Sequence, residues 1–503
     1  MNAKDSRILR KRKQKLRKRL ERRQWSAQSK PMFRAQNIHY EMADKVRAVD
    51  CGALGAFHLL ARNTGLIRAI DEKLHLLKRH LPYHESDHVL NIAYNTLAGG
   101  TCLDDIELRR NDETYMDALA ADRIPDPTTA GDFTRRFAEQ DVLSLMEAIN
   151  AIRPKIWKKR LRGAERKEAI LDVDGTLAPT TGECKEGMGL AYNGVWGYHP
   201  LLISLANTLE PLYLVNRSGN RPSHDGAAEW LDRAIALVDE SFEQVCLRGD
   251  TDFALTANFD RWAEDGVRFV FGKDATKNLV DIAEGLSKRH WSVLERRENR
   301  AASGKRRRRP VNVKERIVVE KEYKNITLQK EHVAEFSYQP GKCSRPYRVV
   351  VLRKKLLVEQ GQMILCDGVR YFFYITNIED MSPAEVVLFS NERCNQENLI
   401  EQLKNGLNAL RMPVGDLVSN WAYMVMSALA WTLKAWFALL VRHRQRREEL
   451  LKMEFRRFLN NIVRLPTQII RAGRRIVFRI LGYNDWTRTL LITYDTIGQL
   501  RLA

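Results

Sequence analysis

Three acidic residues lie at the ends of predicted strands or at the start of a predicted helix, where their carboxylates could take part in catalysis or bind a metal. Asp174 follows the apolar, β-prone run 169–171, Asp250 lies near the end of QVCLRGDTDF, and Glu397 lies at the start of a helical pattern. A carboxylate at the end of a buried strand is costly unless a partner or a metal neutralises it. The acids are 76 and 147 residues apart, so only a tertiary fold can bring them together.

Carboxylates that meet at one point repel one another, and such groups normally hold divalent cations. Two Mg²⁺ ions about 3.5–4 Å apart can activate a water or hydroxyl and stabilise the leaving oxygen of a phosphodiester. Two further acids, Asp172 and Asp252, lie two residues from Asp174 and Asp250. Residues two apart on a strand share a face, so the residues alone leave the choice within each pair open.

The elements that must position these acids follow the order of a ribonuclease H-like sheet. The pattern predicts three strands, a helix, a strand, a helix and a strand, at 170–174, 198–208, 211–215, 224–239, 244–253, 254–265 and 267–271. A three-strand meander extended by parallel strands gives this order, and it places the first and fourth strands side by side. Asp174 and Asp250 would then lie at neighbouring strand ends.

The charge of the chain points to a polyanionic partner. The formal net charge is +20 over 503 residues, and residues 1–34 alone carry 14 Lys and Arg against 2 Asp and Glu. A basic arm on a basic body favours nucleic acid or an anionic membrane surface. The helical pattern of residues 45–150 suits a DNA-binding domain, and a plain helical packing domain explains it equally well.

Between the fifth strand and the next helical stretch, residues 275–385 read as a β-rich insertion. It holds the charged loop KRRRRP at 305–310 and strand patterns in RIVVEKEY, RVVVLRKKL and RYFFYITNI. Trp291 in this insertion could stack on an unpaired base, but a packed core tryptophan is favoured.

Residues 421–440 form an apolar helical stretch that is long enough to span a bilayer. Lys434 near its centre would cost about 2.5–3.5 kcal/mol in a membrane, which favours a buried helix. The seven cysteines are dispersed and contain no CxxC pair, which argues against a disulfide framework or a zinc site and fits a reducing cytoplasm. The N-terminus lacks the apolar core of a secretory signal, so a soluble cytoplasmic protein is expected.

The helical stretch SNERCNQENLIEQLK resembles the Tyr-Arg-Glu-Lys signature of bacterial insertion-sequence DDE transposases. Arg393, Glu397 and Lys404 have the spacing of its Arg-Glu-Lys part, and Ser390 stands where the signature has tyrosine. Three motifs are similar to that group's first- and second-aspartate boxes: DGT at 174–176, YHPLL at 198–202 and RGDTDF at 248–253.

The helical start with its LAGG, the basic LPTQIIRAGRR and the position of the insertion resemble the IS-thirteen-eighty family of the IS-four-like group. The resemblance covers residues 45 to 480. It implies that Asp174, Asp250 and Glu397 are catalytic and hold two Mg²⁺ ions, with Mn²⁺ as a substitute. Water would cleave at the element's end, and the freed 3′-hydroxyl would attack target DNA.

The resemblance also implies DNA contacts by Arg393 and Lys404, which lie eleven residues apart, or three helical turns, in one predicted helix. The partners would be double-stranded DNA, both the element's terminal inverted repeats and the target, and a second copy in a homodimer that pairs two ends. No membrane partner is expected. The location would be the bacterial cytoplasm, on the nucleoid when DNA is bound.

The expected fold class is α/β, with a ribonuclease H-like catalytic core split by a β-rich insertion, a helical DNA-binding region before it and a basic helical tail after it. The predicted domains are a basic arm at 1–34, a helical DNA-binding domain at 35–160, the core at 161–274 and 386–440, the insertion at 275–385 and the basic C-terminal region at 441–503.

Three other functions fit parts of the sequence. Residues 172–176 also match DxDGT, the nucleophile motif of haloacid-dehalogenase-like phosphatases, in which Asp172 would attack phosphorus. That fold needs helices alternating with parallel strands, whereas two strand candidates follow directly here. A catalytically inactive DNA-binding transposase remnant is the second, and a membrane-associated protein anchored by 421–440 is the third.

Overall fold

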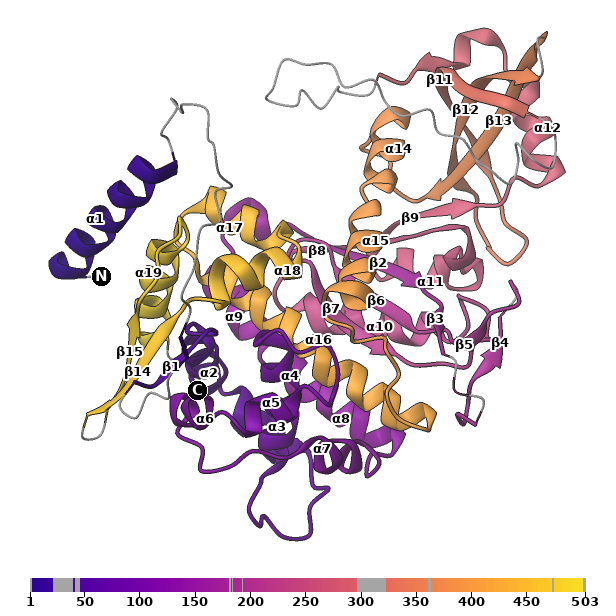
Figure 1. Cartoon of the computed structure of the whole chain (residues 1–503). Coiled ribbons are helices and arrows are strands. Elements are labelled where there is room, and N and C mark those ends of the chain that lie inside the picture. The colour runs from indigo at the N-terminus through magenta and orange to yellow at the C-terminus, as the bar shows by residue number, and fades with distance from the viewer. Residues whose placement is uncertain are drawn as a thin grey trace.

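The structure is a computed structural model that describes residues 2–20, 39–40, 46–180, 182, 184–191, 193–295, 323–360, 363–472 and 475–500. It is a mixed α/β fold in which helices surround one nine-stranded sheet (Figure 1). The predicted loop at 305–310 and all but the last residue of the strand predicted in RIVVEKEY lie outside the described residues.

Five strands form the ribonuclease H-like part of this sheet: β2 (Glu168–Gly175), β6 (Leu201–Leu205), β7 (Glu210–Val215), β8 (Gln244–Gly249) and β9 (Arg268–Lys273). They lie in the order β7-β6-β2-β8-β9. The β6 strand is antiparallel to β2 and β7, whereas β2, β8 and β9 run parallel. The prediction that the first and fourth strands are neighbours is therefore confirmed.

The fourth strand is shorter than its apolar pattern predicted. It ends at Gly249, and Thr251–Phe253 form a 3₁₀ turn, η2. The Asp250 side chain accepts a hydrogen bond from the Asp252 backbone N–H at 3.0 Å, and this cap turns the chain out of the sheet. Helices α10 (Ala227–Asp239), which packs on β2, β6, β7 and β8, and α11 (Phe259–Glu264) complete this part.

The strands of the insertion extend the same sheet. They are β10 (Ser292–Val293), β11 (Tyr323–Tyr338), β12 (Tyr347–Gln360) and β13 (Met363–Thr376), preceded by α12 (Lys277–Gly285). The β13 strand pairs antiparallel with β9, so one continuous sheet runs from the core to the far tip of the insertion (Figure 1). Trp291 packs against the main core, and the Arg353 guanidinium lies over its ring at 3.9 Å, which agrees with the expectation of a packing role.

Helices occupy the region before the first strand, as the three- and four-residue spacing of apolar side chains predicted. They are α2 (Leu54–Asn63), α3 (Leu66–Lys73), α4 (Glu85–Leu97), α5 (Ile106–Arg110), α6 (Glu113–Leu119), α7 (Pro127–Thr134), α8 (Glu139–Asn150) and α9 (Arg153–Arg160). The basic arm contributes α1 (Ala3–Leu20).

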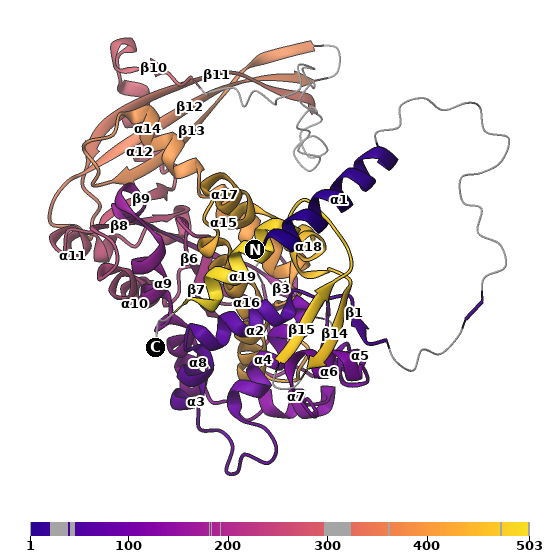
Figure 2. The same ribbon diagram turned by 90° about the vertical axis from the view of Figure 1, so that its left-hand side faces the viewer.

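Helices follow the insertion in an unbroken series before a small β hairpin. They are α14 (Pro383–Asn391), α15 (Cys394–Glu401), the π-helix η5 (Gln402–Gly406), α16 (Leu417–Leu440), α17 (Arg444–Lys452), α18 (Phe455–Phe458) and the π-helix η6 (Leu459–Val463). Strands β14 (Thr467–Ala472) and β15 (Arg475–Ile480) pair with the short β1 (Ala48–Val49), and α19 (Thr487–Gly498) comes last. Figure 2 shows α1 near these C-terminal elements.

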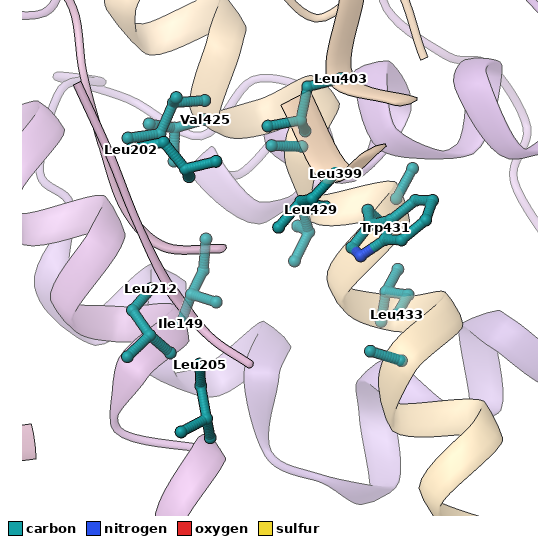
Figure 3. Packing of buried hydrophobic residues seen from close by; sticks show 14 of the residues in the cluster. Ile149, Leu202, Leu205, Leu212, Leu399, Leu403, Val425, Leu429, Trp431 and Leu433 are labelled. Carbon is teal, nitrogen blue, oxygen red and sulfur yellow. The ribbon is translucent and has the colours of Figure 1, made fainter. Parts of the chain in front are cut away.

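The apolar helix α16 lies at the centre of the core. Its side chains meet those of β6, β7, α8 and α15, as Figure 3 shows for Val425 and Leu429 beside Leu202 and Leu399. Among the described residues, α16 alone is long and apolar enough to cross a membrane, and its most apolar window is wholly buried in the protein. The prediction of a buried helix is confirmed.

A buried ion pair ties α16 to the sheet and to the N-terminal helices. Glu210 on β7 is fully buried and pairs with Arg153 of α9. It also accepts hydrogen bonds from the indole N–H groups of Trp157 and Trp436, both at 2.8 Å. With its charge paired and its oxygens satisfied, Glu210 joins three layers of the fold without an unpaired buried charge.

Lys434, the charged residue inside α16, gives the first testable prediction. Burial lowers its pKa well below 10.5, while its ammonium Nζ donates to the Leu451 carbonyl at 2.9 Å and lies 3.5 Å from the Trp431 ring centre. Below pH 10.5 the Lys434 amine binds a proton in the unfolded chain more readily than in the folded chain. The free energy of unfolding therefore falls as the pH falls below 10.5, by up to about 1.4 kcal/mol per pH unit. We expect the thermal unfolding midpoint to rise less between pH 8 and pH 10 in Lys434→Met than in the wild type.

The exposed Lys452 on α17 provides the control for this measurement. Lys452→Met should keep the pH dependence of the wild type, because it replaces a surface side chain and leaves the buried Lys434 in place. Identical pH dependences in Lys434→Met and the wild type would contradict the assignment.

Candidate active site

The register between β2 and β8 brings two aspartates to neighbouring strand ends. Asp172 lies opposite Arg248 in this parallel pair. Asp174 stands two residues further along β2, and Asp250 directly follows the last residue of β8, so both lie at the carboxyl ends of adjacent strands. Ligands bind at this edge in open α/β sheets.

Glu397 reaches the same edge from the first turn of α15. The neighbouring side chain, Gln396, is 2% exposed and donates from Nε2 to the carbonyl oxygens of Asp172 at 3.0 Å and Leu202 at 3.1 Å. These two bonds fix the start of α15 on strands β2 and β6. Sequence reasoning missed Gln396, because nothing distinguishes a buried amide in a polar helical stretch.

Arg393 lies between the carboxylates. Its Nη1 donates to Asp174 Oδ2 at 2.9 Å, and its Nη2 lies 3.7 Å from Glu397 Oε1. Burial raises the pKa of Asp250, and the charge of Arg393 opposes that rise. The guanidinium therefore counters the charge of all three acids that the sequence singled out.

The pKa values of Asp174 and Asp250 reflect their burial and the charges around them. Burial raises the pKa of Asp174 to about 6, Arg393 opposes this shift, and the charges of Asp250 and Glu397 add to it. Burial also raises the pKa of Asp250, again against the effect of Arg393. Carboxylates that raise one another's pKa gain stability from any cation placed among them.

The donor set fits Mg²⁺ in its chemistry. All three side chains offer carboxylate oxygens, which are the ligands that this hard cation prefers. In the part of the chain that the structure describes, no three His, Cys, Asp or Glu side chains are gathered as a finished metal site. Glu397 is 59% exposed and lies near Arg393, so it is free to turn toward Asp174 and Asp250.

The predicted single helix from Ser390 to Lys404 is wrong. Glu392 and Arg393 form a turn between α14 and α15, and α15 passes into the π-helix η5 before it reaches Lys404. The Phe455 backbone N–H donates to Gln402 Oε1 at 2.8 Å, so packing against α18 accompanies the wider turn. The argument from three turns of 3.6 residues therefore fails.

Lys404 nevertheless lies near the acids. Burial lowers its pKa, and the charges of Glu401 and Asp174 oppose that shift. Ser390, at the place of the signature's tyrosine, is buried near the end of α14 and is not exposed to a ligand from solvent. Arg393 and Lys404 thus lie near Asp174, and Ser390 lies in the packed interior.

The two pairs of aspartates that pattern could not separate differ in their surroundings. Asp172 is 1% exposed, and its two oxygens accept bonds from Arg248 Nε at 2.7 Å and Nη2 at 2.9 Å. Asp252 is exposed to solvent. Asp172 is committed to a buried pair, whereas Asp174 and Asp250 face the partly open strand ends. A charged residue in the middle of the apolar run QVCLRG was the available signal that Arg248 needs a buried partner.

His199 is a further residue that sequence reasoning missed. It is 7% exposed, its Nδ1 lies 2.8 Å from the Arg221 carbonyl oxygen, and burial lowers its pKa. A methyl group on Gly175 would come within 2.9 Å of His199 Nε2, so glycine beside Asp174 leaves room for the imidazole. The motif YHPLL was noted for its resemblance, but its histidine was not singled out.

Comparison with known proteins gives a matching family and similar solved structures. The model of the family described as transposase DDE domain group 1 matches residues 34–502. No curated protein matches the chain. A cryo-EM structure of the piggyBac transposase synaptic complex with hairpin DNA is similar at 10% sequence identity and a TM-score of 0.37, over 90% of this chain and 88% of that one.

Proposed function

Because the chain belongs to the family of DDE transposase domains of group 1, we propose that it is a transposase that cleaves DNA at the ends of its own element and joins the freed ends to target DNA. The family match covers 469 of the 503 residues, from 34 to 502, and includes all three acids. The proposal makes Asp174, Asp250 and Glu397 the catalytic residues.

One observation carries this assignment. Asp174 and Asp250 lie at the carboxyl ends of the parallel neighbours β2 and β8, and Gln396 holds the start of the helix that carries Glu397 against the same strands. Three acids 76 and 147 residues apart thus come to one strand edge with a raised pKa at Asp174 and Asp250. Carboxylates whose pKa is perturbed by burial and by nearby charges are candidates for a functional site.

The side chains of the site have separate tasks in phosphoryl transfer. Asp174, Asp250 and Glu397 would hold two Mg²⁺ ions, with Mn²⁺ as a substitute. When bound, the metal supplies a cationic centre that stabilises charge on the attacking and leaving oxygens. Arg393 and Lys404 bring positive charge to the same edge, where they can orient a phosphodiester against the carboxylates.

His199 has a fixed orientation in this site. Its Nδ1 meets the Arg221 carbonyl, so Nδ1 carries the proton and Nε2 keeps its lone pair. A lowered pKa keeps the ring neutral near pH 7, where Nε2 can accept a hydrogen bond beside Gly175. The fold therefore fixes the orientation of this imidazole before DNA arrives.

The finer parts of the proposal rest on the resemblance of the motifs to the IS-thirteen-eighty family. They are recognition of the terminal inverted repeats, attack on target DNA by the 3′-hydroxyl, and a homodimer that pairs two ends. The place of action would be the bacterial cytoplasm, at the nucleoid. The basic arm and the net charge of +20 support a DNA partner, because cations on the protein release the counterions of the duplex.

The experiment that tests the proposal is strand cleavage of a labelled duplex that carries the element's own end. The wild-type protein should nick this duplex in Mg²⁺ and in Mn²⁺ and should not do so in EDTA. A labelled target plasmid in the same reaction should receive the cleaved end. Binding without cleavage under every metal condition would instead identify a DNA-binding remnant.

A generic phosphate ester in a parallel reaction tests the haloacid-dehalogenase-like alternative. The structure argues against that alternative, because Asp172 is paired with Arg248 and β6 runs antiparallel to β2. Hydrolysis of the ester without DNA cleavage would overturn the transposase assignment.

A further inference from the structure

A basic hollow lies between the N-terminal helix α1 and the C-terminal elements, apart from the acids of the candidate active site. It encloses ≈ 1500 Å³, part of it open to solvent. One wall is α1, and the other comes from α17, α19 and the loop before α19 (Figures 1 and 2). Its charged lining comprises four cations and one carboxylate: Arg10, Lys13, Arg446, Arg488 and Asp485.

Backbone carbonyl groups help to hold α1 in this position. Arg12 Nη1 donates to the backbone carbonyl oxygens of Ile480 and Gly482, both at 3.0 Å. Of the eighteen residues of α1, ten are Lys or Arg and one, Asp5, is acidic. This contact is made to neutral oxygens, so α1 brings a strongly positive charge to the hollow.

The cations on the two walls have little charge compensation. In the described part of the chain, Arg10, Lys13 and Arg488 form no ion pair, and the one lining carboxylate, Asp485, already accepts a bond from the Tyr483 hydroxyl at 3.2 Å. Arg446 has Glu449 at 3.6 Å and lies 4.3 Å from the Trp486 ring centre. Two positive walls that face each other repel, and an anion between them removes that cost.

We propose that this hollow binds the phosphodiester backbone of duplex DNA, with α1 on one side of the strand and α19 on the other. The proposal rests on the proposed function, because it takes DNA as the partner of the chain. Arg10, Lys13 and Arg488 contact phosphates and read no bases. The site adds affinity and fixes the position of the duplex, while the carboxylate edge does the chemistry.

A lipid surface fits this hollow less well than a duplex does. A helix that lies on a membrane presents a broad apolar face to the acyl chains. The apolar residues of α1 are few, and Leu9 points into the hollow lining while Ile8 and Leu16 are 38% and 40% exposed. A concave site with cations on two sides matches a charged strand that can enter it.

The test is the salt dependence of duplex binding, measured by fluorescence anisotropy between 50 and 300 mM KCl. Each lost phosphate contact lowers the slope of log K against log salt by about 0.9. The variant Arg10→Ala/Lys13→Ala/Arg488→Ala should therefore lose about 2 to 3 from the slope, equally for the element's end and an unrelated duplex. The charge-conserving variant Arg10→Lys/Lys13→Arg/Arg488→Lys should keep the wild-type slope.

The matched control removes the same charge from exposed residues of the insertion, outside both the hollow and the predicted DNA-binding domain: Lys288→Ala/Arg289→Ala/Lys342→Ala. Equal salt slopes in the two alanine variants would overturn the proposal. It would also be overturned if the Arg10/Lys13/Arg488 alanine variant lost binding to anionic phosphatidylserine vesicles while its duplex binding stayed unchanged. Nicking of the element's end at 50 mM salt separates the two proposals. If the wild-type protein neither binds nor cuts the duplex, the transposase assignment is refuted. If the wild-type protein binds and cuts, but the Arg10/Lys13/Arg488 alanine variant keeps the wild-type salt slope, only the proposed site in the hollow is refuted.

Discussion

Asp174→Asn is expected to reduce strand cleavage by roughly a thousandfold or more while leaving the protein folded. Asparagine keeps the size of the side chain and one of its oxygens but removes the charge that draws a divalent cation. The carboxylate contributes to a shared site with Asp250 and Glu397, so Asp250→Asn and Glu397→Gln should show losses of similar size. Because these acids are proposed to act as a unit, a variant that changes two of them should cleave DNA little more slowly than either single variant. Nicking of the labelled duplex in Mg²⁺ measures each loss.

The stability of Asp174→Asn gives an independent readout with a definite sign. The pKa of Asp174 is raised from 3.8 to about 6 in the folded state, chiefly by burial. The ionised group therefore costs the metal-free protein stability as the pH rises from 3.8 through 6, and the cost remains above that range. At pH 7.5 without metal, Asp174→Asn should unfold no lower than the wild type. Added Mg²⁺ should raise the unfolding midpoint of the wild type and should raise that of the variant much less.

Cleavage by Asp174→Asn at a tenth of the wild-type rate or more would refute its role. A fall of its unfolding midpoint below the wild-type value in metal-free buffer at pH 7.5 would show instead that its pair with Arg393 is structural. Asp252→Asn is the matched control, because Asp252 is exposed and lies two residues from Asp250. It should retain cleavage.

Asp172→Ala should lower the free energy of unfolding by about 3–5 kcal/mol. The carboxylate and the Arg248 guanidinium form a bidentate pair, with side chains 1% and 2% exposed. Removal of Asp172 leaves a buried guanidinium with the Phe389 carbonyl at 2.8 Å and the exposed Glu392 at 3.8 Å. A single neutral acceptor and a distant carboxylate do not replace the lost charge. Urea denaturation of the purified variant measures the loss.

The double variant Asp172→Ala/Arg248→Met distinguishes this cause from simple loss of packing. It removes both charges, so its stability should lie well above that of Asp172→Ala. Asp252→Ala should change stability by no more than about 0.5 kcal/mol, because it alters an exposed side chain. Equal losses in Asp172→Ala and the double variant would show that the pair carries no charge coupling. Because Asp172→Ala is expected to destabilise the fold, a loss of activity in this variant is not evidence that Asp172 is catalytic.

The sequence determined the local features of this protein well. Alternation and apolar runs located the strands of the core, helical spacing located the N-terminal helices, and the lysine inside residues 421–440 marked a buried helix. Order along the chain was sufficient for the sheet topology, because a three-strand meander followed by helix-linked strands has few ways to form one sheet. Strand patterns also located the strand ends that carry the two pairs of aspartates, whereas the choice of Asp174, Asp250 and Glu397 came from the resemblance to DDE transposases.

Only the tertiary structure separated Asp172 from Asp174. Both acids share one face of β2, and the difference between them is a partner, Arg248, that lies 76 residues away in the sequence and opposite Asp172 in the sheet. The same holds for Gln396, His199 and the turn at Arg393, whose roles depend on contacts with distant carbonyls. Periodicity reports the repeat of a single element, whereas the burial and charge of a side chain depend on every element packed around it. For this reason the chain's pattern predicted where the carboxylates lie, and packing decided which of them is buried in a pair and which face the open strand ends.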